Sequence, residues 1–358
     1  MNNSSCLLKE TDSQSQVISW YRTPLDPKFM KAIHQRSDWR GAFQAFSYLG
    51  LLISTGSLTF YASGHWPLGV TLLLLFLHGT VCAFRGNAVH ELEHGTVFKT
   101  KFLNAFFTRL FAFFGWHNVD GFNSMSHTRH HRYTLHPPDD LEVVLPSKFA
   151  LSHLLRAGIL FPRGFYEPIK AAISYACDRF ESKWETFLYP EGSEQRKSRV
   201  KWARTMLAGH ALIIGLSIYF HLWIVPLLTT FTHAYGGWLS KLCNNTQHIG
   251  LQDNVPDFRF CCRTFTVNPV VQFLYWHMNF HTEHHMYAAV PCYNLGRLHA
   301  AIRHDLPPCP HGLVATWKEI FSILKIQEAN PEYQHIARLP ETVNVSLVSG
   351  INPAPEPS

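Results

Sequence analysis

Residues 66–84, WPLGVTLLLLFLHGTVCAF, contain no Asp, Glu, Lys or Arg, and the motif His90-Glu-Leu-Glu-His94 comes shortly after them. An apolar run of this length is close to the roughly 20 residues that a helix needs to cross a bilayer. A helix from Trp66 to His90 would rise about 36 Å, which is more than the roughly 30 Å hydrocarbon core. The stretch therefore predicts a membrane anchor that delivers two histidines just outside the membrane.

Other apolar stretches extend this pattern. Residues 43–62 also lack Asp, Glu, Lys and Arg, as do residues 205–240, which are long enough for two helices joined near His221. For any single stretch, the alternative is a buried helix of a soluble core. We predict an all-α integral membrane fold of four transmembrane helices in two hairpins, at about residues 43–62, 66–86, 205–221 and 222–242.

Basic residues predict the orientation of these spans. Four Lys or Arg residues between positions 28 and 40 precede the first span, and five between positions 196 and 204 precede the third. The short connections within the hairpins carry none. Because cytoplasmic loops carry the positive excess, both termini and residues 85–204 are expected in the cytosol. The net charge of +6 is then charge at a membrane surface and does not indicate nucleic-acid binding.

Eight histidines form three close clusters, all on the expected cytosolic side. On a helix, spacings of three and four residues place side chains on one face, so each cluster can present its imidazoles to one point. Eight imidazoles are twice what one tetrahedral zinc ion uses, which predicts a site for two metal ions. The clusters are His90 and His94; His127, His130 and His131; and His281, His284 and His285.

In type, order and spacing, these HxxxH, HxxHH and HxxHH motifs resemble those of the membrane fatty acid desaturases and their hydroxylase relatives. The resemblance covers about residues 25–325. It implies a cytosolic helical cap that holds a non-haem di-iron centre, with O2 as co-substrate. The implied iron ligands are the eight clustered histidines and His248. Asn244, one turn before His248, could contact a metal through water or could serve as a helix-end cap.

Each acidic residue near the histidines has two possible roles. Glu91, Glu93 and Glu283 lie inside the motifs, and Asp139 and Asp140 follow the second one. Each could orient a ligating imidazole by accepting a hydrogen bond from its other ring nitrogen. The alternative for each is an ordinary surface charge or a helix-end interaction.

The resemblance implies O2-dependent desaturation of an acyl chain in a lipid or lipid-like substrate. The alternatives are a hydroxylase or oxygenase that acts on a lipid, terpenoid or polyketide chain, and, from a different class, a zinc-dependent membrane hydrolase or a non-catalytic metal-binding membrane protein. The sequence contains no glycine-rich fingerprint for a nicotinamide or flavin cofactor. An external electron donor is therefore expected, either cytochrome b5 or a ferredoxin, together with its reductase.

The expected domain organisation has three parts. Residues 1–24 are a disordered cytosolic N-terminus, residues 25–325 form the membrane domain, and residues 326–358 are a mostly disordered cytosolic tail. The protein is expected to be a multi-pass membrane protein of the endoplasmic reticulum if its host is eukaryotic, or of the inner membrane if it is bacterial.

Overall fold

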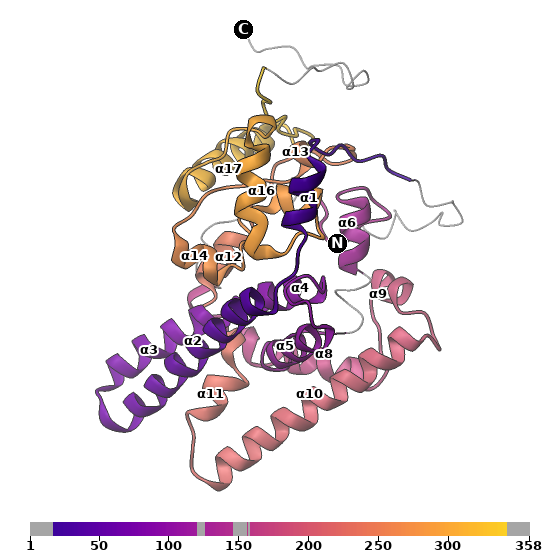
Figure 1. Cartoon of the computed structure of the whole chain (residues 1–358). Coiled ribbons are helices and arrows are strands. Elements are labelled where there is room, and N and C mark those ends of the chain that lie inside the picture. Colours follow the sequence, from indigo (N-terminus) through magenta and orange to yellow (C-terminus); the bar gives the residue numbers. More distant parts are fainter. Residues whose placement is uncertain (1–16, 120–125, 146–155, 157, 342–358) are drawn as a thin grey trace.

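The computed structural model describes residues 17–119, 126–145, 156 and 158–341. Within these residues the secondary structure is helical, and β-structure is limited to isolated bridges. The prediction of an all-α fold is therefore confirmed. Figure 1 shows two elongated helical arms that extend from one end of a compact body of shorter helices.

The first arm is the predicted first hairpin. It consists of α2 (Asp38–His65) and α3 (Leu68–Cys82), which pack against each other, and α3 leads through a short turn into α4 (Arg85–Glu93). The hydroxyl of Ser37 accepts a hydrogen bond from the backbone of Arg40 and so caps the start of α2. Pro67 provides the break between α2 and α3, because it cannot continue a helix.

Length and composition mark two described segments as able to cross a membrane, Asp38–His65 and Leu68–Glu93. Their most apolar windows are only 22% and 44% buried. Large side chains such as Phe43, Ile53 and Leu73 are exposed. A soluble core helix would bury such residues, whereas a large exposed apolar surface is typical of contact with lipid.

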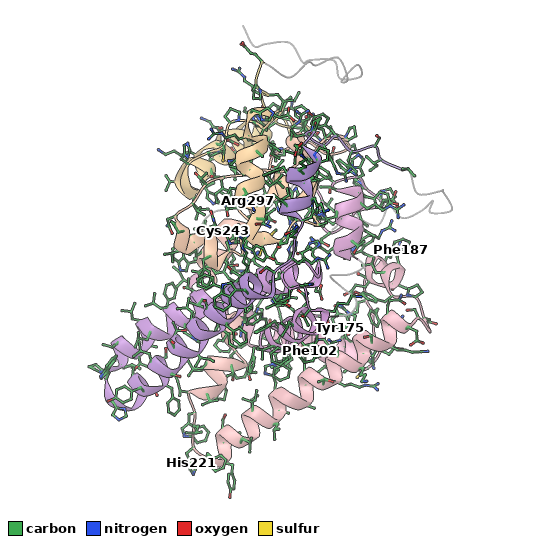
Figure 2. All side chains as sticks on the ribbon, viewed as in Figure 1. Phe102, Tyr175, Phe187, His221, Cys243 and Arg297 are labelled. Atoms are coloured by element: carbon green, nitrogen blue, oxygen red, sulfur yellow. The ribbon has the colours of Figure 1, made fainter. Side chains whose placement is uncertain are left out.

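The second arm differs from the prediction. Its first helix, α10 (Glu194–Tyr219), contains most of the predicted third span and ends near His221, which lies at the tip of the arm in Figure 2. The predicted fourth span, residues 222–242, is wrong as a continuous helix. It is divided into α11 (Val225–Thr229), the 3-10 helix η4 (Thr232–Ala234) and α12 (Trp238–Asn244).

Close packing against α3 explains why this segment is broken. Gly236 has a φ of +72°, and a Cβ atom there would lie 2.6 Å from the backbone nitrogen of Thr80. Its backbone nitrogen donates to the carbonyl of Ile159 (3.1 Å), and Phe161 donates in turn to the carbonyl of Ala234 (2.7 Å). The chain here bonds to another segment and not to its own preceding turn, so it cannot remain helical.

The body carries the remaining helices. Its core includes the fully buried side chains of Phe98, Phe107, Phe258, Phe265 and Trp276. The helices are α1 (Pro27–Ile33), α5 (Lys101–Phe114), α6 (Thr128–Tyr133), η3 (Pro162–Phe165), α8 (Glu167–Ala176), α9 (Lys183–Leu188), α13 (Phe258–Cys261), α14 (Pro269–Leu274), α15 (His281–Met286), η5 (Cys292–Asn294), α16 (Leu295–Ile302), η6 (Arg303–Asp305) and α17 (Gly312–Ala329).

Packing contacts continue on both sides of residues 25–325, the expected membrane domain. Trp20, in the segment expected to be disordered, stacks on Phe258 with ring centroids 4.1 Å apart, and the hydroxyl of Tyr21 donates to Asp305 (2.8 Å). At the other end, α17 continues to Ala329, and the backbone of His335 bonds to the carbonyl of Gly250. The rest of the two predicted tails, residues 1–16 and 342–358, lies outside the described residues.

Candidate metal centre

Three short helical segments carry the clustered histidines. His90 lies in the last turn of α4, and His94 directly follows this helix as its C-cap. His127 precedes α6, which carries His130 and His131, and α15 begins at His281. Within each segment, spacings of three or four residues direct the ligand-bearing side chains toward the same side.

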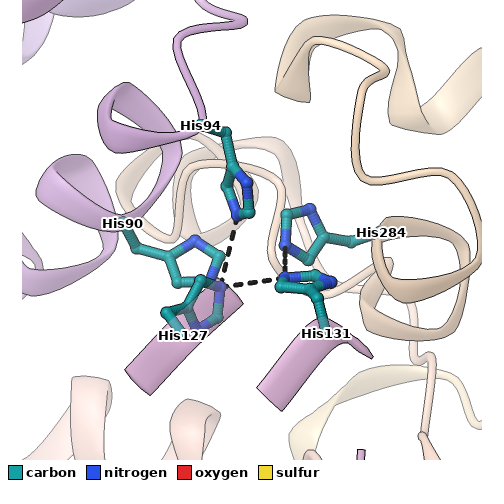
Figure 3. Close-up of side chains that lie close together, drawn as sticks. All are labelled: His90, His94, His127, His131 and His284. Atoms are coloured by element: carbon teal, nitrogen blue, oxygen red, sulfur yellow. Dashed lines mark hydrogen bonds between the residues drawn. The ribbon is translucent and has the colours of Figure 1, made fainter. Parts of the chain in front are cut away.

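The first cluster contains His90, His94, His127, His131 and His284. One ring nitrogen from each lies within 4.8 Å of those of the others. Figure 3 shows the five rings converging from three separate segments. The Nε2 atom of His127 is 3.2 Å from that of His94 and 2.9 Å from that of His131, whose Nε2 is 3.1 Å from that of His284.

The second cluster contains His130, His248, His281 and His285, all of them buried. The Nε2 atoms of His281 and His248 are 2.9 Å apart. The Nε2 atom of His285 is buried and has no hydrogen-bond partner among the described residues. A buried basic nitrogen without a partner is costly, which points to a group that would bind it.

The two His-His pairs divide their side chains between the clusters. His130 belongs to the second cluster and His131 to the first, and His285 and His284 divide in the same way. Neighbouring residues on a helix are about 100° apart around its axis, so they point to different places. The rings of His131 and His285 are 4.3 Å apart, which places the clusters side by side.

The nitrogen spacing fits the coordination of metal ions. A metal–imidazole bond is about 2.1 Å, so two cis ligands at a right angle lie about 3.0 Å apart. The observed Nε2–Nε2 separations of 2.9–3.2 Å match this value. The residues present therefore fit one metal ion in each cluster.

Hydrogen bonds at Nδ1 fix the orientation of several rings. The Nδ1 atom of His127 is 3.0 Å from Glu142, and that of His130 is 2.8 Å from Asp140. The Nδ1 atom of His248 donates to the carbonyl of Cys261 (2.7 Å). A proton held at Nδ1 leaves the Nε2 lone pair free for a metal.

Two further residues, Thr134 and Glu91, contact Nδ1 atoms of clustered histidines. Thr134 donates its hydroxyl proton to the carbonyl of His130, so its oxygen is free to accept from the Nδ1 atom of His285 (3.1 Å). The carboxylate of Glu91 is fully buried between two rings of the first cluster, 3.3 Å from the Nδ1 atom of His90 and 3.4 Å from that of His284.

The environment keeps most of these imidazoles neutral. Burial, together with the neighbouring imidazoles, lowers the pKa of His94 to about 4. Burial and the charge of His130 lower the pKa of His248 to about 3. Burial first, and then the charges of neighbouring histidines, lower the pKa values of five further histidines in this group well below their usual range. These histidines are His127, His131, His281, His284 and His285.

His130 is the exception. Burial alone would lower its pKa, but the hydrogen bond and charge of Asp140 outweigh that effect and raise it. The pKa of Asp140 is lowered in turn, because the bond to His130 and two backbone N–H bonds outweigh burial. The pair therefore places a fixed negative charge directly behind one ring of the second cluster.

The structure brings all nine sequence-predicted histidines into the two clusters. Asn244 lies outside them. Its Oδ1 accepts from Asn87 (2.9 Å), and its Nδ2 donates to Ser240 (3.2 Å). These bonds tie the end of α12 to α4 and to its own preceding turn.

The acidic residues named from the sequence take different roles. Asp140 and Glu91 contact clustered histidines, whereas Asp139 pairs with Arg129 (2.7 Å). Glu283 bonds to Thr264 and to His299. Sequence analysis missed Glu142, which the acidic run after the second motif could have suggested, and it missed the contributions of Thr134 and of the Cys261 carbonyl.

Comparison with known proteins agrees with this geometry. The family model of the fatty acid desaturases matches residues 64–317, which is well over half of the chain and includes all nine histidines. A comparison with curated proteins gave no match. The chain therefore belongs to the fatty acid desaturase family, whose members are oxidoreductases.

Proposed function

We propose that the protein catalyses the O2-dependent desaturation of an acyl chain in a lipid or lipid-like substrate at a non-haem di-iron centre. The observation that carries this proposal is the pair of adjacent histidine clusters, whose ring nitrogens lie at the spacing of cis ligands. Two iron ions bound there would supply the oxidising power to remove hydrogen from an unactivated C–H bond.

The donor set favours iron over zinc. Catalytic zinc sites use about three protein ligands, whereas these clusters offer five and four nitrogens. An environment of many neutral imidazoles suits redox-active transition metals with several coordination positions. Metal analysis of the purified protein separates this proposal from the zinc-hydrolase alternative.

The protein's own residues would hold and shield the metals. Glu142, Asp140 and the Cys261 carbonyl keep the Nδ1 protons of three rings in place, which aims their Nε2 atoms inward. The nearly complete burial of His281, His284 and His285 keeps bulk water away from the site. A dry site limits side reactions of reactive intermediates.

We further propose that α2 and the α3–α4 segment cross the membrane and that the second arm also enters it. The exposed apolar side chains of α2, α3 and α10 support this placement. The body and both termini would then face the cytosol, at the endoplasmic reticulum in a eukaryotic host. Electrons would come from an external donor, cytochrome b5 or a ferredoxin with its reductase.

The test is a mass-spectrometric lipid profile of cells that express the wild type, His284→Ala or His221→Ala, with a compatible electron donor co-expressed. His221 lies at the exposed tip of the second arm, so its variant controls for the loss of a histidine far from the clusters. We expect a product lighter by two hydrogens in the wild type and in the control, and its absence with His284→Ala.

A product that is heavier by one oxygen and depends on His284 would reassign the protein as a hydroxylase. A product that persists with His284→Ala, or a purified protein that contains zinc and no iron, would refute the di-iron proposal.

A further inference from the structure

An apolar cavity lies where the first arm, the second arm and the body meet, lined by residues of α2, α3, α4, α5 and α11. Its volume is about 400 Å³, and most of its lining is aliphatic or aromatic, including Leu52, Ile53, Phe60, Leu110 and Leu228. None of the nine clustered histidines lines it. The cavity is therefore a feature separate from the candidate metal centre.

A buried cation lines this otherwise apolar cavity. Arg85, at the start of α4, is only 4% exposed and is among the lining residues. Its Nε donates to the carbonyl of Cys82 (3.0 Å), and its Nη2 donates to the hydroxyl of Thr232. Among the described residues, Nη1 has no hydrogen-bond partner, and no carboxylate lies within ion-pair distance of the guanidinium.

A guanidinium without a counter-ion in an apolar wall is costly unless its free N–H groups meet water or a ligand. A buried charge is normally paired, because an unpaired one loses its hydration without compensation. An ionisable residue at membrane depth, facing a cavity, is by default a functional-site hypothesis. Arg85 therefore calls for an anion that arrives from outside the described chain.

The imidazole that lines the cavity, His78, already has hydrogen-bond partners. The Nδ1 atom of His78 is 2.8 Å from the hydroxyl of Thr55, and its Nε2 is 3.0 Å from the carbonyl of Leu228. Each ring nitrogen thus has a partner within the protein. Of the two basic side chains that line the cavity, Arg85 is therefore the one with an unpaired nitrogen.

The two ends of the cavity differ in their chemistry. The antiparallel packing of α2 and α3 sets Gly56 beside His78, and Tyr48 bonds to the carbonyl of Val81. Lining residues of α2 run from Leu49 to Phe60, a rise of about 16 Å along the helix. Arg85 thus lies at the end nearer the metal centre, and Phe60 lies toward the hairpin tip. A lipid of the cytosolic leaflet would enter with its charged end in this same orientation.

We propose that this cavity binds a long-chain fatty acid, with its carboxylate on Arg85 and its hydrocarbon chain along α2. One guanidinium in an apolar wall matches a compact monoanion with a single tail. A volume of about 400 Å³ is near the lower end for small-molecule sites, which favours one chain over a two-chain phospholipid.

The test measures the binding of radiolabelled oleate to the purified full-length protein in detergent, with unlabelled oleate, methyl oleate and a phospholipid as competitors. We expect saturable binding that oleate displaces and that the uncharged ester and the phospholipid do not. Arg85→Gln should weaken binding by about tenfold or more, because it removes a charged hydrogen bond, and Arg85→Lys should retain part of it.

Further variants distinguish oleate binding in this cavity from binding elsewhere on the protein and from effects of misfolding. Ser57→Trp, at an exposed lining position of α2, should block the tail while leaving Arg85 intact, so the proposal stays testable if Arg85→Gln does not fold. Arg297→Gln, an exposed arginine on α16, should bind oleate like the wild type. His284→Ala should also retain binding.

Three results would overturn the proposal. They are equal displacement by methyl oleate or by phospholipid, unchanged oleate binding in both Arg85→Gln and Ser57→Trp, and loss of binding in His284→Ala. The last would place the carboxylate on the metal centre and not on Arg85.

Discussion

Replacing Asp140 with Asn tests whether the charge behind His130 matters for the metal centre. Asp140 is fully buried, and its Oδ2 accepts from the Nδ1 atom of His130 (2.8 Å) and from the backbone of Leu135 (2.8 Å). Its Oδ1 accepts from the backbone nitrogen of Glu142 (2.9 Å). The carboxylate therefore meets three donors and offers no proton of its own.

Asparagine preserves the shape but cannot accept all three bonds. With its amide nitrogen in the Oδ1 position, it faces the backbone N–H of Glu142 and loses that bond but retains the bond to His130. In the opposite orientation it loses two bonds, so the first orientation is preferred. The variant should therefore keep the His130 ring oriented while removing the negative charge behind it.

The expected loss in iron affinity is about 10- to 100-fold, the usual effect of removing a partner of a metal-bound histidine. This range corresponds to about 1.4–2.7 kcal/mol. The assay is iron content per mole of purified protein, measured by mass spectrometry of the metal after dialysis against graded concentrations of a chelator.

Asp139→Asn is the matched control. Asp139 pairs with Arg129 at a partly exposed position, and such pairs contribute only about 0–1 kcal/mol. We expect its iron retention to equal that of the wild type. Equal iron loss from the two variants, or full retention by Asp140→Asn, would refute the idea that the negative charge of Asp140 strengthens metal binding through His130.

Three other predictions concern pH, Asn244 and Gly236. The pKa values of His94 and His248, lowered to about 4 and about 3, lie below the unfolded value of about 6.5. In metal-free protein the unfolded state therefore takes up protons first, and the melting temperature should fall as the pH drops from about 6.5 toward 4; a flat profile would contradict this. Asn244→Ala should retain iron but lose about 1–3 kcal/mol of stability through its two broken hydrogen bonds, and loss of iron with unchanged stability would instead support a ligand role. Gly236→Ala should cost about 2–5 kcal/mol through left-handed backbone strain and a clash with α3, read as reduced monodisperse protein in size-exclusion chromatography. Gly237→Ala should not, because a Cβ atom there would meet only the Lys241 side chain at 3.5 Å, an ordinary van der Waals contact.

The first hairpin and the histidine clusters could be predicted from sequence because their signals are local. A long apolar run and a spacing of three or four residues each fix a structural outcome within one helix. The eight histidines identified in this way come together in two clusters, together with His248, which the family resemblance implied. The meeting of histidines from distant parts of the chain could be predicted because the expected topology places all of them at one face of the membrane.

The broken segment after α10 was mispredicted because its geometry depends on a partner that the local composition does not reveal. Residues 222–242 are as apolar as a spanning helix, yet Tyr235 and Gly236 lie tightly against α3. Pro226 and the Gly236–Gly237 pair are residues that can break a helix. The apolar composition of residues 222–242 nevertheless favours one continuous helix when the sequence is considered alone. Glu142 was missed for a related reason, since its contact with His127 depends on a loop path.

Because adjacent histidines are divided between the two clusters, metal binding at one site should affect metal binding at the other. His130 and His131 share α6, and His284 and His285 share α15, so any shift or rotation of either helix moves ligands of both clusters. One metal ion should therefore stabilise the helix positions that the other requires. Substituting a ligand of one cluster should lower metal content at both, and a double substitution across clusters should cost less than the sum of the single ones. If the single variants each lose only one of two metal ions, α6 and α15 are held by the rest of the body, and the two sites are independent.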